Sequence, residues 1–420
     1  LKEGGRTGTA GGGHARLRSA LVIAELAVAL VLLTGAGLLL RSFEKLREVN
    51  VGFRTDHMLT ASYGLPAKQY STQAAVDSFN SELLLKLRQL PGVQAAGVTS
   101  LLPASNNLAL SGFVADGYVP AKPGDLNLGW PSQVMGDYFS AAGIPLLRGR
   151  TFTESDRESS PLVAIVNRSL AQHFWPGQDP IGKRIRIGVE GSPTPWMTVV
   201  GEIGDIKQTA PDQDTMAQFY QPAGQLKTSM AGFAPPDMIN ASGGTIVLRT
   251  ALAPEQMAQA LLSVVRSIDP QLPLTQVESM DRVVSEGEAP RRFNTALISS
   301  FAGAAVLLAL LGIYGVIAFS AALRTQEMAI RLALGSERGG VMRLILISGA
   351  KLGLIGCGIG GVAAIFATRL MRTLLFQVDP LDPTVIVLAA ISIFLLAIAA
   401  SVVPAWRAAA IEPMQALRQE

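Results

Sequence analysis

The chain has 420 residues, of which 49% are hydrophobic and only 16% are charged. Because an average soluble protein carries about 25% charged residues, this composition excludes a disordered or fibrous chain and indicates a membrane protein of two or three domains. The net charge of +3 comes without a basic face or arm, so nucleic acid is not a predicted partner. The single cysteine, Cys357, excludes a disulfide framework and a cysteine-ligated metal cluster.

The first predicted membrane span covers residues 18–41, and residues 1–17 before it are predicted to be a cytoplasmic linker. Between Arg18 and Arg41 lie 22 apolar or small residues with one charge, Glu25, and a helix of that length reaches about 33 Å, enough for the ~30 Å core of a bilayer. A cleaved signal peptide would have a shorter apolar region of about 7–15 residues, so a retained span is favoured. Glu25 is either a proton or ion relay or, as we favour, a carboxylate that pairs with Arg18 or hydrogen-bonds to another helix.

Residues 42–290 are predicted to form a large α+β domain outside the cytoplasm. Amphipathic helices are predicted at 71–90, with a Ser or Thr cap and a Pro91-Gly92 stop, and at 255–268. The stretch 204–244, rich in Gly, Pro, Gln, Asp and Met, is predicted to be a long loop or mobile lobe. Strands are predicted at 58–65, 93–102, 163–166, 183–189, 197–203 and 245–250.

Three further spans are predicted in the last third of the chain, at residues 293–323, 347–369 and 384–406. With four spans both termini lie on one side of the membrane, and a modest excess of Lys and Arg favours the cytoplasm for that side. The segment 370–383 is then a short outer loop, and the cytoplasmic segments are 324–346 and the tail 407–420.

No catalytic motif stands out in the sequence. Residues 177–183 have the spacing of a phosphate-binding loop, but Arg184 stands where Ser or Thr would bind Mg²⁺, and Pro180 lacks a backbone N–H. His173, beside Phe174, is interpreted as a packed or surface residue, and no catalytic triad, carboxylate pair or metal-ligand spacing is found. The sequence predicts a protein that is not an enzyme, does not hydrolyse ATP itself, and uses no cofactor or metal.

Small residues recur at every fourth position of the third predicted span. Such rows let a second helix approach closely within a membrane, so we predict helix packing rather than a dinucleotide loop, which would need a preceding strand. One row is Gly349, Gly353, Cys357 and Gly361, and the next is Gly356, Gly360, Ala364 and Thr368.

The loop between the second and third predicted spans, residues 324–346, carries the strongest functional signal. Glu327 can pair with Arg324 and with Arg331 at helical spacing, and Gly335 provides a C-terminal stop. A short amphipathic helix can lie on lipid or dock into a groove of a partner. On the residues alone, a solvated surface helix is an equally weighted alternative.

The sequence resembles the FtsX-like permease family and, within it, the MacB-type exporters, over essentially the whole chain. RTQEMAIRLALGS (324–336) resembles the family's R-x-x-E-[IM]-x-[IL]-R-x-A-x-G signature, and PAWRAAAIEPMQALRQE (404–420) resembles its C-terminal motif. Residues 143–156, 163–187 and 199–207 are similar to MacB-like periplasmic core domains. The nearest similarity is to the second half of duplicated orphan permeases, so the chain is expected to be a fragment that starts in an inter-module linker.

The resemblance implies a membrane protein with four transmembrane α-helices in a 1+3 arrangement and a large α+β extracytoplasmic domain of MacB periplasmic-core type. The implied function is that of a permease subunit of a type VII ABC transporter in the bacterial inner membrane, used for efflux or export. A separate cytoplasmic ATPase would hydrolyse ATP and dock on the loop, and its motion would reach the periplasmic domain. Residues with an implied coupling role are Arg324, Glu327, Ile330, Arg331, Leu334 and Gly335.

The resemblance also implies partners and alternatives. The partners are a cytoplasmic ABC ATPase, a second permease module in a dimer, a periplasmic adaptor or outer-membrane channel, and the lipid membrane. The alternatives are a lipoprotein-releasing permease, an FtsX-like transmembrane regulator of cell-wall hydrolases, and a membrane sensor that works without an ATPase. The size of the outer domain, about 250 residues by position, argues against the regulator, whose corresponding domain is smaller.

Overall fold

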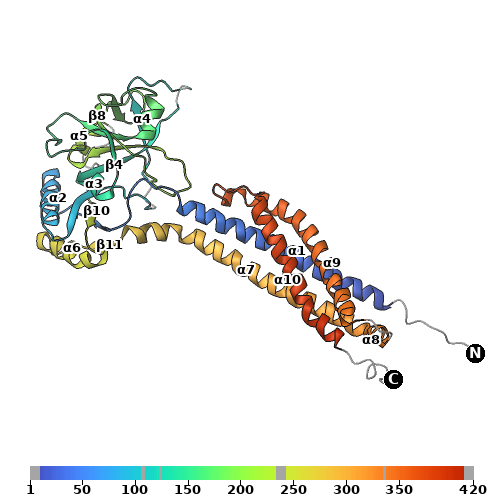
Figure 1. Cartoon of the computed structure of the whole chain (residues 1–420). Coiled ribbons are helices and arrows are strands. Elements are labelled where there is room, and N and C mark those ends of the chain that lie inside the picture. The colour runs from blue at the N-terminus through green and yellow to red at the C-terminus, as the bar shows by residue number, and fades with distance from the viewer. Residues whose placement is uncertain are drawn as a thin grey trace, which may run out of the picture. The chain divides into compact units, whose positions relative to one another are not determined.

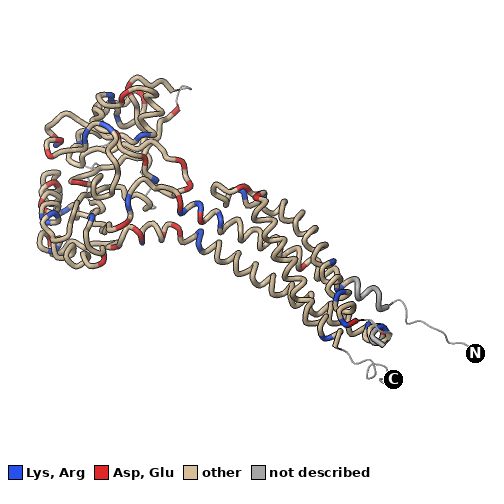
Figure 2. The backbone as a smooth tube through the Cα atoms, in the orientation of Figure 1, with Lys and Arg blue, Asp and Glu red and all other residues tan. Residues whose placement is uncertain are grey.

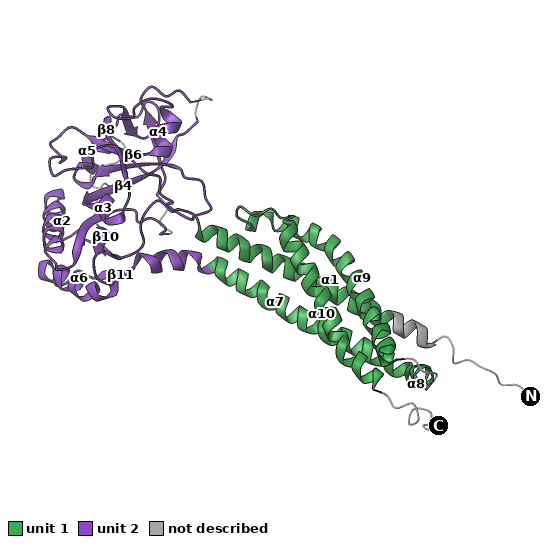
Figure 3. Cartoon of the chain, in the orientation of Figure 1, with its two compact units in different colours: residues 1–48, 290–420 green, residues 49–289 purple. Residues whose placement is uncertain are grey.

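The structure is a computed structural model that describes residues 10–105, 109–120, 122, 125–232, 243–333 and 337–410. The chain divides into two compact units (Figure 3). The helical unit comprises residues 1–48 and 290–420, and the α+β unit comprises residues 49–289.

Long apolar helices make up the helical unit. Among the described residues, four helical segments are long and apolar enough to cross a membrane, and they follow the predicted order of one N-terminal and three C-terminal spans. In Figure 2 the charged residues of these helices lie mainly toward their ends. The elements are α1 (Ala10–Arg47), α7 (Met280–Leu323, which begins in the α+β unit), α8 (Thr325–Ala333), α9 (Arg338–Leu370), η2 (Arg372–Leu374) and α10 (Pro383–Ala409).

Helix α9 packs along both α1 and α10 (Figure 1). Their contact surfaces bury residues such as Leu26 and Leu30 of α1 and Ile393 of α10, together with Ile313 and Ile317 of α7. Large apolar side chains on the other faces stay exposed, among them Phe366 and Leu388. Exposure of apolar side chains along whole helices is costly in water and suits the hydrocarbon of a bilayer.

The α+β unit is built on one extended sheet. Its strand order is β11-β1-β10-β2-β4-β3-β7-β8-β6-β9, with β5 beside β8. β9 returns to pair in parallel with β4, so the strands from β4 to β9 in this order close into a ring. The strands are β1 (Met58–Gly64), β2 (Val93–Thr99), β3 (Ser111–Ala115), β4 (Leu128–Gly136), β5 (Leu146–Gly149), β6 (Val163–Asn167), β7 (Arg184–Ile187), β8 (Met197–Ile203), β9 (Ala217–Pro222), β10 (Gly243–Thr250) and β11 (Leu274–Ser279).

Helices cover both faces of the open part of this sheet. α2 begins after Thr72, whose hydroxyl accepts the Ala75 N–H at 3.3 Å, and packs with α6 on one face. In β10, Ile246 and Leu248 point into that layer while Val247 points to the other face, as the twofold period of a strand requires. The helices are α2 (Gln73–Arg88), α3 (Tyr138–Ala142), α4 (Arg168–Phe174), η1 (Ala223–Gln225), α5 (Leu226–Ser229) and α6 (Pro254–Ile268).

The prediction that residues 204–244 form a long loop or mobile lobe is wrong for part of this range. β9, η1 and α5 lie inside it, and β9 is the strand that closes the ring; residues 233–242 lie outside the described part of the chain. The segment AQFYQP was overlooked because its Gln and Pro residues resemble a loop. In the structure Gln218 and Gln221 are buried, and the Gln218 side chain donates to the Ile206 carbonyl at 2.8 Å.

An ion pair fixes the segment that follows β5. Two nitrogens of Arg150 donate to the Asp156 carboxylate at 2.7 and 2.9 Å, and the Thr153 N–H donates to the same group at 2.8 Å. The Arg150 hydrogen bonds are the first cause that lowers the pKa of Asp156 from its ordinary 3.8, with burial acting in the opposite direction. A carboxyl whose pKa is lower in the folded state stabilises the fold above the unfolded pKa, and this contribution is lost as the pH falls through the folded value.

We therefore expect Asp156→Asn to destabilise the purified chain by about 1–2 kcal/mol at pH 7, a value kept small because Arg150 is half exposed. The wild-type contribution begins to fall once the pH drops below the ordinary pKa and is lost as the pH passes the lowered folded value, so the difference in urea midpoint should shrink as the pH falls from 7 to below the ordinary pKa. Glu158→Gln, at an exposed site in the same segment, is the control. A midpoint difference that does not change with pH would contradict the assignment.

Candidate functional site

Helix α8 is a short separate helix at the end of α7. The two helices are divided at Arg324, and the Thr325 hydroxyl donates back to the Ala322 carbonyl at 2.7 Å, a local bond that competes with continuation of the helix. Met328 of α8 is buried in the core of the helical unit, in one cluster with Val341 and Ile345 of α9. One apolar side chain therefore fastens α8 to the membrane-spanning helices.

The outward side of α8 carries the charges that the sequence singled out. Arg331 donates to the Glu327 carboxylate at 2.6 Å, and both side chains are half exposed. An exposed pair at this spacing contributes only about 0.3–0.5 kcal/mol to helix stability. Ile330, on the same helix, is an apolar residue with 46% of its surface exposed.

A cavity of about 170 Å³ lies between α8 and the start of α9. Arg324, Glu327 and Arg331 line one part of it, and Val341 and Leu344 line another. Because an apolar cavity of about 150 Å³ admits benzene, this one is the size of a single inserted side chain. The cavity therefore has one apolar side and one side with charges of both signs.

The structure thus brings three of the predicted coupling residues to one cavity, Arg324, Glu327 and Arg331. Ile330 lies outside its lining, and Leu334 and Gly335 lie outside the described residues. Within the described part of the chain, no group of three His, Cys, Asp or Glu side chains could hold a metal ion.

The two rows of small residues on α9 face two different helices. Gly349 and Gly353 lie against Ser401 and Ala397 of α10, and the Cys357 thiol donates to the Ala390 carbonyl of α10 at 3.5 Å. In the other row, Gly356 lies against Leu26 of α1 and Gly360 against Ala27 of α1, while Ala364 and Thr368 are buried. Gly361 differs from the rest, because a Cβ there would meet no atom within 4 Å.

Glu25 lies on α1 beside Gly312 of α7, where an added Cβ would run into the carboxylate. The expected ion pair with Arg18 is not among the contacts of the described residues. Instead, the Arg18 guanidinium lies over the ring of Phe319, 4.1 Å from the ring centroid. The sequence analysis missed the arrangement because Phe319 lies in an uncharged stretch of α7, five residues before the nearest charge, Arg324, and gives no pattern of its own.

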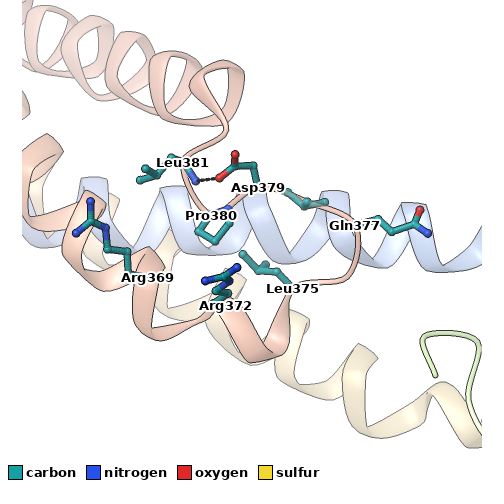
Figure 4. Close-up of a pocket in the computed structure, with 8 residues that line it drawn as sticks. Arg369, Arg372, Leu375, Gln377, Asp379, Pro380 and Leu381 are labelled. Atoms are coloured by element: carbon teal, nitrogen blue, oxygen red, sulfur yellow. Dashed lines mark hydrogen bonds between the residues drawn. The ribbon is translucent and has the colours of Figure 1, made fainter. Parts of the chain in front are cut away.

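A second cavity at the opposite end of α9 was also missed (Figure 4). It has a volume of about 680 Å³ and is lined by two arginines, Arg369 and Arg372, and by the loop that carries Asp379 and Pro380. The sequence signal was available: two arginines three positions apart at the end of a span, followed by a Pro- and Asp-rich turn.

Comparison with known proteins supplies the family. A model described as the MacB-like periplasmic core domain matches residues 19–264, and one described as the FtsX-like permease C-terminal matches residues 299–413. The macrolide export ATP-binding/permease protein MacB of Hahella chejuensis is 26% identical over 295 residues, which cover 67% of this chain and 42% of that protein. The uncharacterized ABC transporter permease YknZ of Bacillus subtilis is 24% identical over 289 residues, covering 67% of this chain and 68% of that protein.

This chain therefore spans about two-fifths of the length of the MacB proteins that it matches. Among solved structures, the periplasmic region of MacB from Actinobacillus actinomycetemcomitans aligns with 59% of this chain and 98% of that chain. The sequence identity in that alignment is 14%, and the TM-score is 0.36.

Proposed function

This chain belongs to the MacB/FtsX-like family of ABC transporter permeases, and from that premise we propose that it transmits the motion of a separate cytoplasmic ATPase to its extracytoplasmic unit. The family assignment made from the sequence motifs is confirmed, and with it a multi-pass membrane protein that has a large extracytoplasmic domain. Membership of an ABC permease family implies an ATPase partner, and no phosphate-binding loop was found in this sequence.

The observation that supports this proposal is the packing of α8 against the membrane-spanning helices. The end of α1 leads into the extracytoplasmic unit at residue 49, so the far end of α7, which bears α8, faces the cytoplasm if each long helix crosses once. There Met328 is buried while Glu327, Ile330 and Arg331 are exposed. A force applied to these exposed groups would pass into α7 and α9 through packed side chains.

The docking surface we propose consists of Arg324, Glu327, Ile330 and Arg331, with the cavity beside them. Interfaces of moderate affinity commonly combine an inserted apolar side chain with a rim of charged groups that sets orientation. The ATPase would insert one side chain into the cavity and pair with the charged rim. Leu334 and Gly335 would complete the helix end, as the family signature implies.

We propose export as the direction of transport. The support is the names of the relatives, since several proteins that match this chain are macrolide export proteins. A second permease module and a periplasmic adaptor are further parts of the proposal. They and the substrate would be tested after the ATPase experiment.

A charge swap on α8 tests the proposal. Glu327→Arg with Arg331→Glu keeps an oppositely charged pair at the same spacing, so the helix should persist, while the charges offered to a partner are reversed. We expect at least a tenfold loss of the vanadate-sensitive ATP hydrolysis that co-purifies with the affinity-tagged full chain, because like-charge contacts cost several kcal/mol at an interface.

The matched control is the same swap at a pair of the α+β unit with the same order and spacing, Glu82→Lys with Lys86→Glu, whose wild-type side chains are joined at 2.8 Å. It should retain ATP hydrolysis at the wild-type level. If the wild-type chain retains no ATPase, or if both swaps retain it equally, the coupling role of α8 is wrong.

A further inference from the structure

The cavity at the α9–α10 loop lies at the outer surface of the membrane. The Arg41 side chain pairs with Asp382 and donates to the Thr384 hydroxyl at 2.6 Å, and the Phe376 N–H donates to the Ser42 hydroxyl at 2.8 Å. These bonds fasten the loop to the end of α1 from which the chain enters the extracytoplasmic unit. The loop therefore belongs to the extracytoplasmic end of the helical unit.

Two arginines give this cavity an unbalanced positive charge. Among the described residues, neither Arg369 nor Arg372 has a carboxylate within ion-pair distance, and the contact recorded for Arg369 is with the Phe366 ring, 5.9 Å from its centroid. The carboxylate that shares the cavity, Asp379, accepts the Leu381 N–H at 2.8 Å inside its own turn (Figure 4). An arginine fork that lacks an acidic partner is well suited to phosphate oxygens.

Apolar side chains stand next to the arginines. Phe366 and Leu370 at the end of α9 and Leu374 in η2 are 63%, 86% and 57% exposed. They follow one another at intervals of four residues, so in the helical part they lie on one side. A free phosphate ion would use the arginines alone, whereas a phospholipid would place its phosphate on the arginines and its acyl chains against these side chains.

We propose that the cavity lined by Arg369 and Arg372 binds the phosphate of an anionic phospholipid in the outer leaflet. The phosphate sits between the two guanidinium groups, beside the turn at Asp379 and Pro380 (Figure 4). A zwitterionic lipid presents the same phosphate together with a cationic group that the arginines repel. The site therefore prefers phosphatidylglycerol to phosphatidylcholine, and it fastens the loop to the headgroup layer.

Native mass spectrometry of the purified full chain tests this proposal. The chain is exchanged into mixed micelles with equal amounts of phosphatidylglycerol and phosphatidylcholine, and the retained lipids are counted. We expect Arg369→Gln with Arg372→Gln to lower phosphatidylglycerol retention at least about fivefold, since each basic side chain near an anionic lipid contributes severalfold. Arg369→Lys with Arg372→Lys should recover part of the loss, because it restores the charge without the fork.

The control removes the same charge elsewhere at this end of the helical unit, by Arg47→Gln with Arg292→Gln, at two exposed arginines outside the cavity. It should leave lipid retention nearly unchanged. A second arm adds excess inorganic phosphate, which should not displace the lipid from the wild-type chain. Equal retention by the wild type and the Gln variant would overturn the site, and full displacement by phosphate would overturn its lipid character.

Discussion

Replacing Gly360 by valine should force α9 away from α1 and lower the unfolding temperature of the purified chain by about 4–8 °C. A Cβ at Gly360 would lie 2.9 Å from the Cα of Ala27 and 3.1 Å from its carbonyl oxygen. Both are backbone atoms of α1, so no side-chain rotation relieves the overlap, and the helices must separate. Overpacking of this kind typically costs about 1–3 kcal/mol. Thermal unfolding in detergent, followed by circular dichroism, measures the shift.

Gly358→Val provides the matched control for this prediction. It lies two residues away on α9, where an added Cβ would meet no atom within 4 Å. Both substitutions change the intrinsic helix propensity by the same amount, so the difference between them isolates the contact with α1. If the two variants unfold at the same temperature, the close approach of α1 and α9 does not stabilise the helical unit.

The long helices could be predicted because each one carries its own signal. A span needs only about twenty apolar residues in sequence, and the spacing of small residues on α9 indicates a close neighbour without naming it. What the sequence could not supply is which helix meets which row. That depends on the fold, which places Gly353 beside Ala397 of α10 and Gly360 beside Ala27 of α1.

In the α+β unit, too, the sequence predicted some strands and not others. β1 and β10 are rich in apolar residues and were predicted nearly to their ends, whereas β9 carries two buried Gln residues, of which Gln218 donates to the Ile206 carbonyl. At the α8 site the charges were predicted from their spacing, but the cavity was not, because Val341 and Leu344 come from the next helix. The arginine cavity was not predicted because it forms only when the α9–α10 loop folds back onto α1.

We expect the second large effect at Arg249, a buried arginine of β10. Its side chain is only 7% exposed, and its three nitrogens donate to the Ala141, Asp56 and Arg54 carbonyls at 2.8, 3.0 and 3.0 Å. Burial, more than the nearby charge of Arg54, lowers the pKa of Arg249 from its ordinary 12.5. The guanidinium thus joins β10 to α3 and to the segment that follows α1 in the chain.

Arg249→Met should destabilise the α+β unit by about 3–5 kcal/mol, because it leaves one buried and two partly buried carbonyls without their donor. Arg249→Lys should recover a minor part, since one ammonium cannot reach three carbonyls in the fork geometry. Urea unfolding of the purified chain, followed by the fluorescence of its buried tryptophans, measures the loss. Arg266→Met, at an exposed position of α6, is the control and should stay within about 0.5 kcal/mol of wild type.

The same variant separates stability of the outer unit from docking at α8. Arg249 belongs to the α+β unit and Met328 to the core of the helical unit, so loss of the Arg249 bonds leaves the groups that hold α8 in place. Arg249→Met should therefore retain co-purifying ATP hydrolysis at the wild-type level while the segment around Arg54 becomes sensitive to limited proteolysis. Loss of both properties together would mean that the ATPase requires an intact extracytoplasmic unit, and α8 alone would then not account for docking.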